Sequence, residues 1–368
     1  MDAVATQYLK KWSGLGKSAN IALVYLSGSM GGLNLPRLSV LHKKLQVSRQ
    51  CQLLVSRDSC VCFLADCHLK RELSLVRKKF KPAEVARDAM KIKPGVTSKT
   101  IVKTAKVLVR DEANTDLLEK LHSQERQGQM SRCTSSEGAP IWAKVVQSLP
   151  EEQMKFALNA AVDVLPHNAN LHLWKKRKDP SCPLCKGNQT LLHVLNNCTI
   201  ARNARRYNSR HDAVLKVINE AIKSHLSPTT TLTVDIGNTY SFPLHIVATD
   251  LRPDVVWWDE RCRSLYLAEL TICFESNFEE ASRRKTVKYM DLVEEAQAKG
   301  YKTTLITLQV GSRGVPDLPG FETLARTLNM PPKVSKKLLE SASKQALVGF
   351  NYGVQCKKQI ILSLVKLF

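Results

Sequence analysis

The sequence predicts an α+β protein with a helical N-terminal region, a small cysteine-rich knuckle, and a C-terminal mixed sheet flanked by helices. Three observations favour this fold class. The first half of the chain combines basic residues with apolar residues at helical spacing. Three cysteines and one histidine then lie close together between residues 182 and 198. The last part alternates short apolar runs with long helical stretches, as a sheet covered by helices does.

Composition and turn residues divide the chain into four predicted segments: 1–75, 76–178, 179–225 and 226–368. The first holds a basic amphipathic helix after a Gly-Gly turn, and residues 76–140 show no chemical motif. Further helices are expected near 82–92, 97–108, 111–125, 151–165, 320–329, 332–347 and 357–368.

The charge of the chain points to a polyanionic partner. Among 368 residues there are 55 Lys and Arg against 33 Asp and Glu, a formal net charge of +22. No apolar run is long enough to span a membrane, and the first 30 residues lack the pattern of a secretory signal. Eleven cysteines in such a chain favour thiols and metal ligands in a reducing compartment over disulfides.

Two apolar runs on either side of the turn Asp259–Arg263 predict a β-hairpin. If the hairpin is centred between Arg261 and Cys262, residues whose numbers add up to 523 face each other. Asp254 then lies opposite Glu269, with Cβ atoms about 5 Å apart. Two carboxylates this close repel each other unless a proton or a cation lies between them. A hard divalent cation, Mg²⁺ or Mn²⁺, satisfies both.

The residues after the hairpin, 276–300, form a strongly helical run, and 301–310 return as a strand. Lys285, Lys288 and Tyr289 share one side of this helix. A lysine delivered to a metal–carboxylate pair positions or activates a water and stabilises charge on a phosphate. Taken singly, a Pro-Asp pair is an ordinary turn and the lysines are a solvated helix face. The order of carboxylate, carboxylate and lysine on strand, strand and helix favours a catalytic site.

The sharpest local motif is C-x2-C-x7-H-x4-C, formed by Cys182, Cys185, His193 and Cys198. Four thiolate and imidazole ligands at such spacing close a tetrahedral Zn²⁺ site of the structural type. The alternative is that these are ordinary core residues, which requires all the spacings to arise by chance.

A basic stretch follows the knuckle and begins an amphipathic helix. Its arginines are assigned to contacts with nucleic-acid phosphates: Arg202, Arg205, Arg206 and Arg210. Trp257 and Trp258 offer a different contact, the stacking of a base. Alternation along a strand instead places one ring on each face of the sheet, which favours packing in the core.

The order RPD, AEL and KxxKY resembles the restriction-like endonuclease of site-specific non-LTR retrotransposons, a domain of the PD-(D/E)XK nuclease fold. The resemblance implies that Asp254 and Glu269 bind the catalytic Mg²⁺ or Mn²⁺. It also implies that Lys285 is the catalytic lysine, with Lys288 and Tyr289 completing the signature.

Two positions depart from the usual pattern. Thr271 stands where the general nuclease motif has a lysine, but in the retrotransposon branch the helix supplies that lysine. Glu269 stands where the family often has Asp, and either residue can hold a metal.

The resemblance extends to the other segments. The knuckle is similar to the CCHC knuckle that precedes this nuclease, and the GGLxLP turn before a basic helix is similar to the polymerase thumb of the same elements. The four segments are then a thumb-like region, a helical linker, a zinc knuckle with its basic helix, and the nuclease. The thumb would grip nucleic-acid backbone through Lys10, Lys11, Arg37, Lys43, Lys44 and Arg49.

The resemblance implies a nuclear enzyme whose partners are its DNA target and the element RNA, without a membrane. The nick exposes a 3′-hydroxyl that primes reverse transcription. The polymerase core is missing, since no Asp-Asp pair occurs in the chain, and an upstream polymerase domain is expected in the full-length element. The alternative is a catalytically inactive remnant that binds nucleic acid through its knuckle and basic helices.

Overall fold

The structure is a computed structural model that describes residues 2–75, 80–92, 97–237 and 241–355. The chain forms two compact units, divided after Ser123, except that Ser13–Asn20 and Gly28–Gly31 belong to the second unit. The predicted α+β class is confirmed, because the described residues form fifteen α-helices and a four-stranded mixed sheet. The finer division into four segments stays a prediction.

The first unit is helical. Its helices are α1 (Asp2–Trp12), α2 (Ala22–Tyr25), α3 (Leu38–Leu54), α4 (Ser59–Ser74), α5 (Pro82–Ile92) and α6 (Ser98–His122). The two helices expected at 97–108 and 111–125 are a single helix, α6, because no glycine or proline interrupts it. Helices α3, α5 and α6 pack together around Val47, Ala86 and Ala105.

The second unit begins with short helices before the sheet. They are η1 (Gly28–Met30), α7 (Gln129–Cys133), α8 (Gly138–Gln147), α9 (Glu151–Ala161), α10 (Asn168–Leu173), η2 (His193–Asn197), α11 (Thr199–Asn203) and α12 (Asn208–Lys223). The helix α9 starts after Pro150, as expected, and buries Met154, Leu158 and Ala161.

The sheet contains β1 (Thr231–Val234), β2 (Val255–Asp259), β3 (Ser264–Cys273) and β4 (Lys302–Gly311), in that order across the sheet. The first three strands are antiparallel neighbours, whereas β3 and β4 are parallel. The parallel pair needs a crossover, and η3 (Glu275–Asn277) and α13 (Phe278–Ala298) provide it. Val255 pairs with Ala268 and Asp259 with Ser264, so the predicted hairpin register is confirmed.

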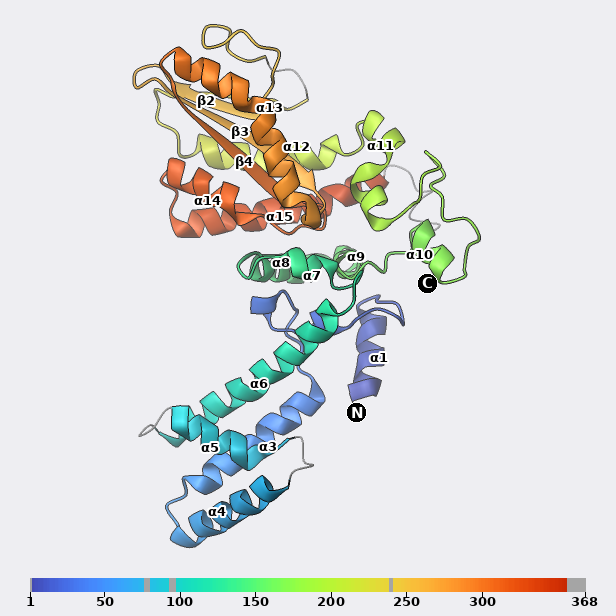
Figure 1. Ribbon diagram of the computed structural model, residues 1–368, viewed down its shortest axis with the longest axis vertical. Coiled ribbons are helices and arrows are strands. Elements are labelled where there is room, and N and C mark those ends of the chain that lie inside the picture. The colour runs from blue at the N-terminus through green and yellow to red at the C-terminus, as the bar shows by residue number, and fades with distance from the viewer. Residues whose placement is uncertain (1, 76–79, 93–96, 238–240, 356–368) are drawn as a thin grey trace. The chain divides into compact units, whose positions relative to one another are not determined.

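Helices cover both faces of the sheet (Figure 1). One face packs on α12, α14 (Leu318–Thr327) and α15 (Pro332–Gln355), and the other packs on α13. Trp257 lies in the first core and Trp258 in the second, and both rings are buried. The two tryptophans are therefore core residues, as alternation along the strand predicts.

The expected terminal helix at 357–368 lies outside the described residues. No helix in the described part of the chain is both long and apolar enough to cross a membrane.

Candidate active site and metal centre

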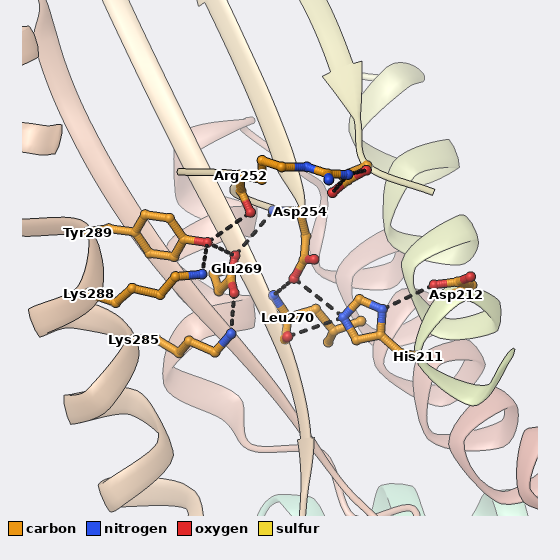
Figure 2. A network of polar contacts seen from close by, with 10 residues as sticks. His211, Asp212, Arg252, Asp254, Glu269, Leu270, Lys285, Lys288 and Tyr289 are labelled. Carbon is orange, nitrogen blue, oxygen red and sulfur yellow. Dashed lines mark hydrogen bonds and ion pairs between the residues drawn. The ribbon is translucent and has the colours of Figure 1, made fainter. Parts of the chain in front are cut away.

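The β2–β3 hairpin brings the two predicted carboxylates together. Asp254 directly precedes β2, and Glu269 lies in β3 across from it. The backbone N–H of Asp254 donates to Glu269 Oε2 at 3.2 Å, and the N–H of Leu270 donates to Asp254 Oδ2 at 2.7 Å. Each carboxylate is thus held by the backbone of the opposite strand, which fixes both side chains at one end of the hairpin (Figure 2).

Helix α13 carries the three other predicted residues to Glu269. Lys285 Nζ forms an ion pair with Glu269 Oε1. Tyr289 Oη lies 2.9 Å from Glu269 Oε2 and 2.9 Å from the carbonyl oxygen of Arg252. Lys288 Nζ donates to Tyr289 Oη at 2.9 Å. Lys285 therefore contacts the carboxylate directly, whereas Lys288 acts on it through the tyrosine (Figure 2).

The site is buried enough for these charges to act strongly on one another. Only 3% of Glu269 is exposed. Burial raises the pKa of Glu269, the charge of Asp254 raises it further, and Lys285 opposes both effects. Burial and the charge of Glu269 raise the pKa of Tyr289, so its hydroxyl keeps its proton as a hydrogen-bond donor. The raised pKa of Glu269 thus reflects its burial and its repulsion by Asp254, which Lys285 offsets only in part.

A histidine that sequence reasoning missed completes the site. His211, from α12, places Nε2 3.4 Å from Asp254 Oδ2 and 3.3 Å from the carbonyl oxygen of Leu270. Its Nδ1 lies 3.3 Å from Asp212 Oδ1. Burial lowers the pKa of His211, but the hydrogen bonds to Asp212 and Asp254 outweigh burial and raise the pKa to about 10. The only signal in the sequence was a His-Asp pair at the start of an amphipathic helix.

The second predicted centre is the knuckle. The ligand atoms of Cys182, Cys185, His193 and Cys198 all lie within 4.8 Å of one another. Cys185 Sγ lies 3.4 Å from His193 Nε2. A tetrahedral zinc with bonds of about 2.0–2.3 Å separates its ligand atoms by roughly 3.5–3.8 Å. The cluster can therefore hold Zn²⁺.

Local backbone geometry explains why this spacing works. Cys182 N donates to Gly187 O at 2.7 Å and Lys186 N donates to Cys182 O at 2.9 Å, so the first two ligands share one tight turn. The other two ligands are five residues apart, and η2 is a π-helical turn that begins at His193. A π-helix bonds residues five apart, so it brings His193 and Cys198 to one side.

The protonation of the knuckle suits a cation. Burial lowers the pKa of His193, which keeps its imidazole neutral, as a metal ligand must be. A backbone hydrogen bond from Gly187 lowers the pKa of the Cys185 thiol, whereas burial raises that of Cys198. A bound cation favours the thiolate form of both cysteines.

The arginines after the knuckle do not share one environment. Arg202 and Arg205 are exposed and Arg206 is half-buried. Only 2% of Arg210 is exposed, and its Nη2 donates to the carbonyl oxygen of Leu195 at 2.9 Å. Burial lowers the pKa of Arg210 to about 10. The structure therefore corrects the prediction for Arg210. Its guanidinium is buried and joins α12 to the knuckle, so it does not lie at a surface where a phosphate could bind.

Comparison of the sequence with models of protein families and with curated proteins finds no match.

Purified protein is expected to contain about one zinc per chain, because the four ligand atoms already surround one position. The double variant Cys182→Ser and Cys185→Ser leaves two ligands and loses the zinc. Elemental analysis of both proteins measures this. The matched control is Cys60→Ser and Cys67→Ser, since both of these cysteines are exposed on α4 and do not belong to the cluster. Equal zinc content in all three proteins would rule out the assignment.

Proposed function

We propose that the chain is a metal-dependent DNA endonuclease of the PD-(D/E)XK type that nicks one strand of its target. The observation that carries the proposal is the convergence of Asp254, Glu269 and Lys285, which come from a hairpin and from the helix that follows it. The mixed sheet with helices on both faces supports it, since this is the architecture that the resemblance predicts.

The donor set of the site suits a hard divalent cation. Two carboxylates and the carbonyl oxygen of Leu270 gather around His211 and Lys285, and oxygen is the ligand that Mg²⁺ and Mn²⁺ prefer. The side chain of Asp254 is 16% exposed, so the donors are open to solvent on one side. Asp254 and Glu269 would hold the cation. When bound, it activates a water and offsets negative charge on the scissile phosphate.

The other residues of the site position these groups. Lys285 lies at Glu269 with a side chain that is 22% exposed, so its ammonium can also reach a phosphate from the solvent side. Tyr289 fixes the second oxygen of Glu269 and ties it to the backbone at Arg252. His211 holds Asp254 from the opposite side. The general nuclease motif has a lysine where this chain has Thr271, and Lys285 of α13 would take its place, as the resemblance implies.

The other predictions from the sequence belong to the same proposal. The knuckle and the arginines at 202, 205 and 206 would bind the DNA target and the element RNA through phosphates. The nick would supply the 3′-hydroxyl for reverse transcription in the nucleus, by a polymerase domain expected upstream in the full-length element. The inactive remnant is the alternative, and it shares the binding surfaces but not the chemistry.

With Mg²⁺ or Mn²⁺, the protein is expected to convert supercoiled DNA to nicked circles, and EDTA stops the reaction. Asp254→Ala and Glu269→Gln abolish nicking because the cation loses a charged ligand. Glu269→Asp retains part of the activity. Lys285→Ala lowers turnover by about 10²-fold, the scale for removing a catalytic polar group, while DNA binding stays nearly unchanged. Agarose gels resolve the two DNA forms.

The exposed Lys302→Ala serves as the control for loss of a lysine, because it lies at the start of β4 and outside the site. Equal nicking by the wild type and Asp254→Ala means that the activity is contamination. DNA binding without nicking in the wild type supports the remnant instead. Loss of activity in Lys288→Ala but not in Lys285→Ala transfers the catalytic role to Lys288.

Replacing Arg202, Arg205 and Arg206 with Gln is expected to weaken DNA binding and to flatten its salt dependence. Three lost phosphate contacts reduce the log–log slope by about 2–3. Anisotropy titrations with duplex DNA at several salt concentrations measure the slope. The variant with Lys333, Lys336 and Lys337 changed to Gln removes the same charge from an exposed face of α15. This variant should retain most of the salt slope of the wild type. Equal losses in the two variants would show that only net charge matters.

A further inference from the structure

A basic groove runs between α3 and α6 in the first unit. Its residue on α3, Lys44, is among those expected to grip nucleic-acid backbone, whereas the sequence predicted no chemistry for α6. It encloses about 380 Å³. Its lining residues are Lys44, Lys99, Val102, Lys103, Lys106, Val107 and Arg110. Five of these seven side chains are cationic and the other two are aliphatic, so the groove has an apolar floor with a positive rim.

The cations of α6 form a row. Lys99, Lys103, Lys106 and Arg110 follow one another at intervals of four, three and four residues, which keeps them on one face of the helix. With a rise of 1.5 Å per residue the row is about 16 Å long. All four side chains are exposed, and half-buried Lys44 faces them from α3.

The charges of the groove are poorly compensated. Within the described residues, one ion pair involves these five cations, that of Arg110 with Asp111 at 3.0 Å. Burial lowers the pKa of Lys44, and the nearby charges of Arg110 and Lys106 lower it further. Cations that disfavour one another's charge are stabilised when an anion enters between them.

The shape of the row selects the class of anion. A nucleic-acid strand carries one phosphate per 3.4 Å of helix axis, so a row of about 16 Å meets several phosphates at once. A single small anion would use only one or two of these cations. No aromatic ring lines the groove, so it offers no platform on which bases could stack.

We infer that the α3–α6 groove binds the phosphodiester backbone of a nucleic acid, without reading its bases. This surface lies in the first unit, whereas the nuclease residues and the knuckle lie in the second. It adds a second polyanion site to the chain, and it stands on the groove itself whether or not the proposed nuclease cleaves.

The test changes Lys99, Lys103, Lys106 and Arg110 to Gln in the full chain. Every protein carries Asp254→Ala, so that no DNA is cut during the measurement. Anisotropy titrations use a 30-base-pair DNA duplex and, separately, a 30-nucleotide RNA of mixed sequence, both over a range of salt. The expected result is a fall of about 3–4 in the salt slope for the duplex and about 3 for the single strand, with a Kd raised at least about tenfold near physiological salt.

Two controls separate a binding site from loss of charge or of fold. Changing the four exposed lysines of α15 to Gln, at 333, 336, 337 and 344, removes the same charge and should alter the slope by less than about one. Exchanging Lys for Arg and Arg for Lys at the four α6 positions keeps the charges and should keep wild-type binding. The inference is overturned if the α6 and α15 Gln variants lose binding equally, or if the α6 Gln variant binds both polymers like the wild type. Loss confined to DNA or to RNA supports it and identifies the occupant.

Discussion

A buried carboxylate must be partnered, and Glu269 is the point where this constraint acts most strongly on the fold. Its three partners come from two places: the backbone N–H of Asp254, just before the neighbouring strand β2, and the side chains of Lys285 and Tyr289 on α13. These contacts form only if the hairpin register, the parallel pairing of β4 with β3 and the orientation of α13 together bring the three partner groups to Glu269. The site is therefore a consequence of how the sheet and its crossover helix are joined.

A second set of buried polar contacts ties the knuckle to the same sheet. Asn196 donates to the carbonyl oxygen of Ile272 in β3, and Arg210 donates to that of Leu195 in η2. Just beyond β3, Glu275 and Arg313 form an ion pair with no exposure to solvent. The knuckle thus contacts the end of β3 that follows the candidate site, which links the two sites physically within one unit.

Much of this arrangement could be predicted from the sequence, because the hairpin and the two faces of its strands depend on residues that are close together in the chain. The hairpin register followed from one turn, and the opposed faces of Trp257 and Trp258 followed from alternation. The sequence did not reveal His211 at the carboxylates or Arg210 in the interior. The place of His211 depends on how α12 packs on β3, and that of Arg210 on how α12 packs on η2. Only tertiary contacts decide whether a basic helical residue faces water, a phosphate or a buried carbonyl. The basic row on α6 was missed for a related reason, because its partner Lys44 is far away in sequence.

The central claim is that Asp254 and Glu269 together hold a divalent cation, and the binding of Mn²⁺ tests it without any substrate. Electron paramagnetic resonance counts free Mn²⁺ in solutions of the zinc-loaded full chain. The account predicts about one tightly bound Mn²⁺ per wild-type chain. Glu269→Gln, which keeps the size of the side chain, should weaken that binding by about tenfold or more, since a charged oxygen ligand is lost. Equal Mn²⁺ affinity and stoichiometry in the two proteins would contradict the account.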